Sequence, residues 1–262
     1  MKLDILAFGA HPDDIELGCG GTILKHINAG YSVGIVDLTK GELGTRGDKN
    51  IRAEETKKSN EVLKISVREN MNLKDGFFEN NEQNKIKAVK LIRKYKPSIV
   101  LTNAPSDRHP DHGRASSLTT DACFLSGLEK IDTGQEIWRP NSIYHYIQFN
   151  NIEPDFVVDI TEFFERKIES IKCYSSQFYD PKSKESETRI SSKDFFESIT
   201  YRAKDMGRLT NCEYAEGFIS YQLNSVNLLT DLNKKKSWLL SALSFIKIYF
   251  IINFLLSTLL SL

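Results

Sequence analysis

Short apolar runs alternate with amphipathic stretches along the first hundred residues. The three strand-like runs are residues 3–10, 32–38 and 98–102, and the three helix-like stretches are residues 22–28, 50–63 and 84–95. Runs of this length suit strands that are buried on both faces. Strands that alternate with helices at this spacing predict crossover units, and therefore a mostly parallel α/β sheet with helices on both faces.

The second half of the chain has a less regular pattern. Its predicted strands are residues 143–149 and 156–160, and its predicted helices are residues 163–173 and 192–208. No internal repeat and no low-complexity linker interrupts it. We therefore interpret residues 1–232 as one domain, which is within the usual size range.

The pattern changes in residues 233–262. Three lysines at 234–236 precede residues 238–262, in which Lys247 carries the only charge. A 25-residue helix spans roughly 37 Å, which exceeds a bilayer core of about 30 Å. We therefore predict an apolar C-terminal helix and favour a membrane segment over a buried terminal helix. The lysines would hold the preceding domain on the cytoplasmic side.

Composition and charge narrow the class of protein. The chain has 35 basic and 35 acidic residues, so no positive surplus favours nucleic acid as a partner. Its four cysteines are scattered without a C-x-x-C pair, which fits a reducing compartment. The first residues do not have the pattern of a secretory signal. We expect a cytoplasmic protein, tethered to the cytoplasmic face if residues 238–262 enter the membrane.

Two segments rich in histidine and aspartate follow predicted strands. Residues 10–14 (AHPDD) come directly after the first strand, and residues 109–112 (HPDH) follow the strand at 98–102. In an open parallel sheet, ligands bind outside the carboxyl ends of the strands. The predicted fold therefore brings the two segments together.

These residue types suit a catalytic metal. Two imidazoles and one carboxylate bind zinc and leave a fourth position for water, whose pKa the metal lowers to about 7. Of the adjacent Asp13 and Asp14, one can bind the metal and the other can act as a base, while a second histidine can protonate a departing amine. Either segment alone could instead be a turn or a helix cap.

Other polar positions favour structural roles. His26 falls in a predicted helix and His145 in a predicted strand. The glycines at 18–21 could cradle a phosphate, but they lack the G-x-G-x-x-G spacing, and close packing explains them equally well. Asp37 ends the second strand, where a dinucleotide-binding fold would hold ribose, but the missing fingerprint disfavours that function.

The two segments resemble those of the LmbE-like (PIG-L-type) zinc deacetylases, which remove N-acetyl groups from glucosamine conjugates. ELGCGGT at 16–22 adds to this resemblance. Further segments resemble the bacillithiol-biosynthesis branch: GELGTRG at 41–47, DGFF at 75–78, SDRHPDHG at 106–113, SQFYDP at 176–181, SITYRAKDMGR at 198–208 and YAEGF at 214–218. The resemblance covers residues 1 to about 220 and implies a Rossmann-like α/β fold.

The resemblance also implies roles for individual residues. They are zinc ligands at His11, Asp14 and His112, a general base at Asp13, an acid or a stabiliser of the tetrahedral intermediate at His109, and Asp111 orienting the ring of His109. The implied substrate is N-acetylglucosaminyl malate, cleaved to glucosaminyl malate and acetate.

The malate moiety carries two carboxylates, which guanidinium groups bind in bidentate geometry. Arg52 and Arg108 are the candidates for this contact, and Tyr201 is a candidate for lining the pocket. The family implies a homo-oligomer, but its members end without an apolar tail. Two alternatives stay open: a deacetylase of another N-acetylglucosamine conjugate, and a non-catalytic sugar-binding protein held at the membrane.

Overall fold

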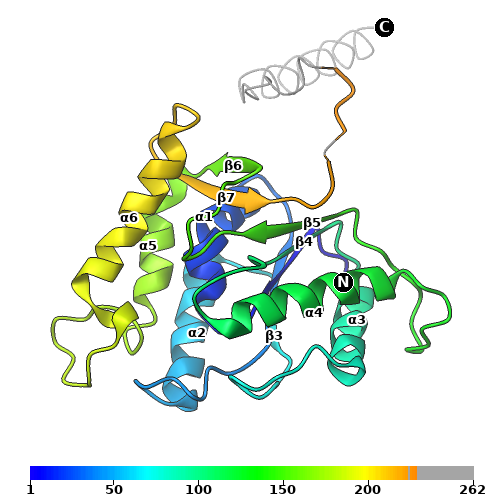
Figure 1. Ribbon diagram of the computed structural model, residues 1–262, viewed down its shortest axis with the longest axis horizontal. Helices are drawn as coiled ribbons and strands as arrows, with labels where there is room; N and C mark the ends of the chain where they lie inside the picture. The colour runs from blue at the N-terminus through cyan, green and yellow to red at the C-terminus, as the bar shows by residue number, and fades with distance from the viewer. Residues whose placement is uncertain (224, 229–262) are drawn as a thin grey trace, which may run out of the picture. The chain divides into compact units, whose positions relative to one another are not determined.

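The fold is built on one seven-stranded sheet. The computed structural model describes residues 1–223 and 225–228 (Figure 1), and residues Met1–Gln222 form one compact unit. The strands are β1 (Ile5–Gly9), β2 (Val33–Asp37), β3 (Val67–Asn70), β4 (Ile99–Asn103), β5 (Ser142–Tyr146), β6 (Phe156–Asp159) and β7 (Ala215–Ile219). Their order is β3-β2-β1-β4-β5-β7-β6, and both pairings of β7 are antiparallel while the other four are parallel. The predicted mostly parallel sheet is confirmed.

Helices cover both faces of the sheet. They are α1 (Asp14–Asn28), α2 (Lys49–Leu63), α3 (Glu82–Tyr95), α4 (Pro110–Ser126), α5 (Phe164–Lys172) and α6 (Lys193–Arg208), with short 3₁₀ turns η1 (Thr161–Phe163) and η2 (Arg189–Ser191). Strand β1 shows the two-sided burial directly. Leu6 and Phe8 pack in the core that includes α3 and α4, whereas Ile5 and Ala7 pack in the core that includes α1. Side chains alternate along a strand, so each face gets every second residue.

Helix α1 begins at Asp14, eight residues before the start predicted from its apolar spacing, and therefore contains the glycine cluster. A Cβ on Gly18 would lie 2.1 Å from the ring of Tyr146, and a Cβ on Gly21 would lie 2.7 Å from Ile160. Contacts this short leave no room for a side chain. Close packing thus explains Gly18 and Gly21 without a bound phosphate.

Helix α1 is kinked at Cys19, whose φ of −146° is not helical. Buried groups satisfy the backbone at this kink. The Glu216 carboxylate accepts from the amides of residues 21–22 at 3.0 and 2.7 Å. Lys167 Nζ donates to the Leu17 carbonyl at 2.8 Å and to Glu216 at 2.6 Å. The ion pair therefore compensates a break that would otherwise leave buried backbone groups unpaired.

The predicted apolar helix and membrane segment at 238–262 lie outside the described residues. Within residues 1–223 and 225–228, no helix is both long enough and apolar enough to span a bilayer.

Gly18→Ala should destabilise the fold, because the new methyl group would collide with the Tyr146 ring. Overpacking of this kind costs about 1–3 kcal/mol, which chemical denaturation measures as a loss in the free energy of unfolding. Gly20→Ala is the matched control in the same helix, because its Cβ would meet its nearest neighbour at 3.6 Å. Equal stability of the two variants would contradict this account of the packing.

Candidate active site

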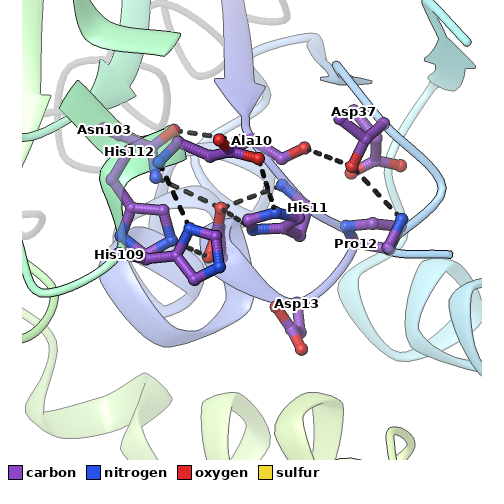
Figure 2. A network of polar contacts seen from close by, with 12 residues as sticks. Ala10, His11, Pro12, Asp13, Asp37, Asn103, His109 and His112 are labelled. Carbon is purple, nitrogen blue, oxygen red and sulfur yellow. Dashed lines mark hydrogen bonds and ion pairs between the residues drawn. The ribbon is translucent and has the colours of Figure 1, made fainter. Parts of the chain in front are cut away.

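The two His-Asp segments meet at the carboxyl ends of neighbouring strands. Strands β1 and β4 are directly paired, and His11 follows β1 while His109 and His112 follow β4. The ring centroids of His11 and His109 are 4.6 Å apart, and those of His11 and His112 are 5.7 Å apart (Figure 2). Asn103, the last residue of β4, links this strand to the first segment by accepting from the Ala10 amide at 3.0 Å.

The carboxylate of Asp14 lies between two of these imidazoles. One oxygen is 3.1 Å from His112 Nε2, and the other is 3.5 Å from His11 Nδ1. Ligand atoms in a tetrahedral zinc site lie about 3.3 Å apart, given bonds of about 2.0 Å. Burial alone would raise the pKa of Asp14, but the charges and hydrogen bonds of His112 and His11 hold it well below its ordinary value. The group is therefore an anion in position to bind a cation.

The outer ring nitrogens of the same histidines face carboxylates. His11 Nε2 is 3.0 Å from Asp75 and 3.4 Å from Asp111, and His112 Nδ1 is 3.2 Å from Asp107. Metal-binding histidines usually donate their second nitrogen to such a group, which fixes the ring and its tautomer. The arrangement fits a zinc ion held by His11, Asp14 and His112.

Two other groupings of ligand atoms share His11. His11, His109 and His112 each offer a ring nitrogen within 4.8 Å of the others, and His11, Asp75 and Asp111 form a second such group. The carboxylates of the second group lie near His11 Nε2. We therefore interpret Asp75 and Asp111 as groups that orient His11.

Asp111 does not orient His109 through its carboxylate, contrary to the sequence-based expectation. Its carboxylate accepts from the Gly76 amide at 2.8 Å and faces His11 and Arg114. Only its backbone amide contacts His109, donating to Nδ1 at 3.2 Å. The reason is local: His109 is the N-cap of α4, and its ring caps the amide of Asp111.

The same cap defines the protonation of His109. Burial lowers the pKa of this imidazole, and the charges of His11 and His112 lower it further. A neutral ring whose Nδ1 accepts a hydrogen bond carries its proton on Nε2. His109 is therefore a neutral hydrogen-bond donor near pH 7.

Asp13 has a strained backbone and a buried charge partner. Its φ of +116° lies in a region of backbone conformation that residues other than glycine rarely adopt. Arg52 Nη1 donates to the Asp13 carboxylate and to the Pro12 carbonyl, each at 2.6 Å. Burial raises the pKa of Asp13 to about 7, while Arg52 acts to lower it. Arg52, expected to contact malate, thus holds Asp13 in place.

A cavity of about 540 Å³ is lined by Asp13, Arg52 and the three histidines of the His-Asp segments. Arg108, a second malate candidate, is part of the lining. Tyr201 is not: its side chain is 64% exposed on α6 and lies outside the lining, whereas its neighbour Arg202 lies in it. Arg189 was missed because nothing in its spacing marks it, and Arg202 was missed although it falls within the motif SITYRAKDMGR. Asp75 and Asp107 were also missed, although both fall within the motifs DGFF and SDRHPDHG.

The remaining candidates have structural partners. His145 is buried, with Nδ1 2.9 Å from Ser116 Oγ, and His26 Nδ1 lies 2.7 Å from the carbonyl one turn earlier in α1. Arg68 donates two hydrogen bonds to the Asp37 carboxylate, at 2.7 and 2.8 Å. Asp37 is therefore engaged within the protein, which again disfavours a ribose contact.

The chain has an α/β fold. At the carboxyl ends of its strands lies a cluster of histidine and aspartate side chains that could bind a metal ion. The model of the PIG-L family, described as GlcNAc-PI de-N-acetylase, matches residues 6–123. Diacetylchitobiose deacetylase of Thermococcus kodakarensis is 31% identical over 186 residues, which is 66% of this chain and 70% of that protein. The chain belongs to the PIG-L family.

Three further relatives are named as a deacetylase, a conserved protein and a hydratase. A probable N-acetyl-α-D-glucosaminyl L-malate deacetylase 2 of Bacillus anthracis is 28% identical over 66% of this chain and 81% of its own length. A conserved protein of Thermus thermophilus superposes with a TM-score of 0.78 and 31% identity, covering 86% of this chain and 98% of that one. The 4-carboxy-2-hydroxymuconate hydratase of Pseudomonas putida gives a TM-score of 0.71 and 25% identity, covering 87% and 100%.

Asp107→Ala should weaken zinc binding by about 10–100-fold, because it removes the carboxylate beside His112 Nδ1. Competition with a coloured chelator measures the affinity. Asp121→Ala is the control, since Asp121 lies on the exposed side of α4 and pairs with Lys85. An unchanged affinity in Asp107→Ala would show that this carboxylate does not support a metal ligand.

Proposed function

We propose that the protein is a zinc-dependent N-deacetylase that releases acetate from an N-acetylglucosamine conjugate, and that the conjugate is N-acetylglucosaminyl malate. The class, an amide hydrolase, follows from the family. The observation that carries the proposal is Asp14 between two imidazoles whose outer nitrogens face carboxylates. A further carboxylate, Asp13, precedes it in the chain.

His11, Asp14 and His112 would hold the zinc ion. When bound there, zinc would lower the pKa of a water molecule and polarise the acetyl carbonyl. Asp13 would take the proton from the attacking water as its oxygen bonds to the acetyl carbon. Burial holds the pKa of Asp13 near 7, a value suited to a base that works at neutral pH.

His109 would act as a donor. Its neutral ring, with the proton on Nε2, can donate to the oxygen of the tetrahedral intermediate without first losing or gaining a proton. The leaving amine needs a proton as the C–N bond breaks, and the proton held by Asp13 after the attack can supply it. Proton gain and loss then balance within one turnover.

The malate assignment rests on two supports. One is the similarity to the Bacillus anthracis deacetylase named for this substrate. The other is Arg108 in the cavity lining, a suitable partner for a carboxylate. Acetate release from N-acetylglucosaminyl malate, N,N′-diacetylchitobiose and free N-acetylglucosamine tests the assignment. A rate on chitobiose equal to that on the malate conjugate would reject it. The homo-oligomer, the cytoplasmic location and the membrane contact stay predictions.

Asp13→Asn should lower kcat by about 10²–10⁴-fold, because the amide cannot accept the water proton. The variant should retain zinc, since its side chain still reaches Arg52 and Asp14 is unchanged. Metal analysis and an acetate-release assay on the same sample measure both quantities.

His112→Ala is the contrasting variant, which should lose zinc and turnover together. Removing the metal from the wild type with a chelator should abolish acetate release, and added zinc should restore it. Full turnover by metal-free wild type, or by Asp13→Asn, would exclude the proposed mechanism.

Arg52→Gln should move the acid side of the pH profile of kcat/KM to higher pH. A base works only when ionised, and the Arg52 charge lowers the pKa of Asp13. Without that charge the pKa rises, so activity is lost at a higher pH as the solution is acidified. Arg208→Gln, at the exposed end of α6, is the control. An unmoved acid side in Arg52→Gln would mean that Asp13 does not titrate in the profile.

A further inference from the structure

Three arginines converge on Phe149, the residue that follows Gln148 beyond strand β5. The guanidinium carbon of Arg108 lies 5.2 Å from the centre of the Phe149 ring, and that of Arg189 lies 5.1 Å from it. Arg202 donates from Nη2 to the Phe149 carbonyl. All four residues line the cavity that contains the His-Asp segments. The arginines come from three separate parts of the chain, so the fold itself gathers them.

These positive charges lack carboxylate partners. Within the part of the chain that the structure describes, none of the three arginines forms an ion pair, whereas Arg52 in the same cavity pairs with Asp13 at 2.6 Å. Arg202 Nη1 is buried and has no hydrogen-bond partner among the described residues. A buried, charged donor without a partner is costly, so an acceptor from a ligand would relieve that cost.

The nearby acid is already engaged. Asp107 faces His112 Nδ1 at 3.2 Å and accepts from the Phe149 amide at 3.3 Å. Its charge therefore serves the histidine and the backbone, although it also acts on Arg202 from a distance. The arginine side of the cavity keeps an excess of positive charge.

The aromatic platform is held in position. The Phe149 ring stacks on Phe195 of α6 with centroids 6.1 Å apart and planes 13° from parallel. Phe195 stacks in turn on the buried Phe178, at 6.3 Å and 7°. The guanidiniums of Arg108 and Arg189 thus lie against a fixed ring, which limits the rotamers that binding would have to restrict.

We infer that Arg108, Arg189 and Arg202 form an anion subsite around Phe149, which selects conjugates whose aglycone carries carboxylates over those with a neutral second sugar. The inference rests on the proposed deacetylase function and deepens it. A dicarboxylate offers four acceptor oxygens, and planar guanidinium groups bind such oxygens in pairs. Because Arg108 directly precedes His109, the subsite begins next to one of the proposed catalytic residues.

The test compares kcat/KM for N-acetylglucosaminyl malate with kcat/KM for the uncharged methyl N-acetyl-α-glucosaminide. The ratio of the two values should fall by about 10–100-fold in each of Arg108→Gln, Arg189→Gln and Arg202→Gln, because each variant removes a charged hydrogen bond to the malate moiety. The change should appear mainly in KM for the malate conjugate. Arg208→Gln is the matched control on the same helix as Arg202, and its ratio should equal that of the wild type.

A second measurement keeps the inference separate from the deacetylase proposal. Free malate, titrated by calorimetry into the zinc-loaded protein, should bind to the wild type and to Arg208→Gln and bind at least tenfold more weakly to the three variants. The wild type and the three variants could hydrolyse both substrates with the same ratio of kcat/KM values. That result would reject the anion subsite and leave the deacetylase proposal intact.

If the wild type hydrolyses neither conjugate, the deacetylase proposal fails, and malate binding alone decides the subsite. Arg202→Gln also loses the bond to the Phe149 carbonyl; should it fail to fold, Arg108→Gln and Arg189→Gln decide the outcome. Malate binding that is equal in the wild type and in those two variants overturns the inference.

Discussion

The pairing of β1 with β4 is the constraint on which the site depends. It brings two segments separated by almost a hundred residues to one edge of the sheet, so that the Asp14 carboxylate lies between His11 and His112. Neither segment contains a complete ligand set. The sheet supplies the precision, because the backbone at the end of a buried strand is fixed by hydrogen bonds on both sides. A loop of the same composition would hold these groups less accurately.

The turn between β1 and α1 carries backbone strain at Asp13, the proposed base. Asp13 adopts a φ of +116°, a conformation that costs about 1–3 kcal/mol. The Arg52 side chain holds both this carboxylate and the preceding carbonyl. Asp13 pairs with Arg52, whereas Asp14 faces His11 and His112. The arginine offsets the charge that burial makes costly. Adjacent carboxylates can thereby serve different purposes.

Apolar periodicity predicted the elements that bury one clear face. The helix predicted at 84–95 is observed at Glu82–Tyr95, since its apolar positions repeat at helical spacing. The same criterion missed β3, whose sequence VREN is half-buried and polar, and α4, which packs through small residues without an apolar stripe. The cluster of histidine and aspartate side chains could be predicted because one of its segments follows β1 directly and the other comes shortly after β4. The partner of Arg52 could not, because a contact between a helix and a distant turn leaves no spacing in the sequence.

Most of the proposed anion subsite lies outside the part of the chain that carries the His-Asp segments; Arg108 is the exception. The family model spans residues 6–123, which include both His-Asp segments. Phe149, Arg189 and Arg202 lie beyond that span, in the turn after β5, in η2 and in α6. A centre that activates water can serve more than one reaction, and the names of the relatives include both deacetylases and a hydratase. We therefore propose that the His-Asp segments carry the reaction. On the same proposal, the charge and shape of the later elements set which substrate binds.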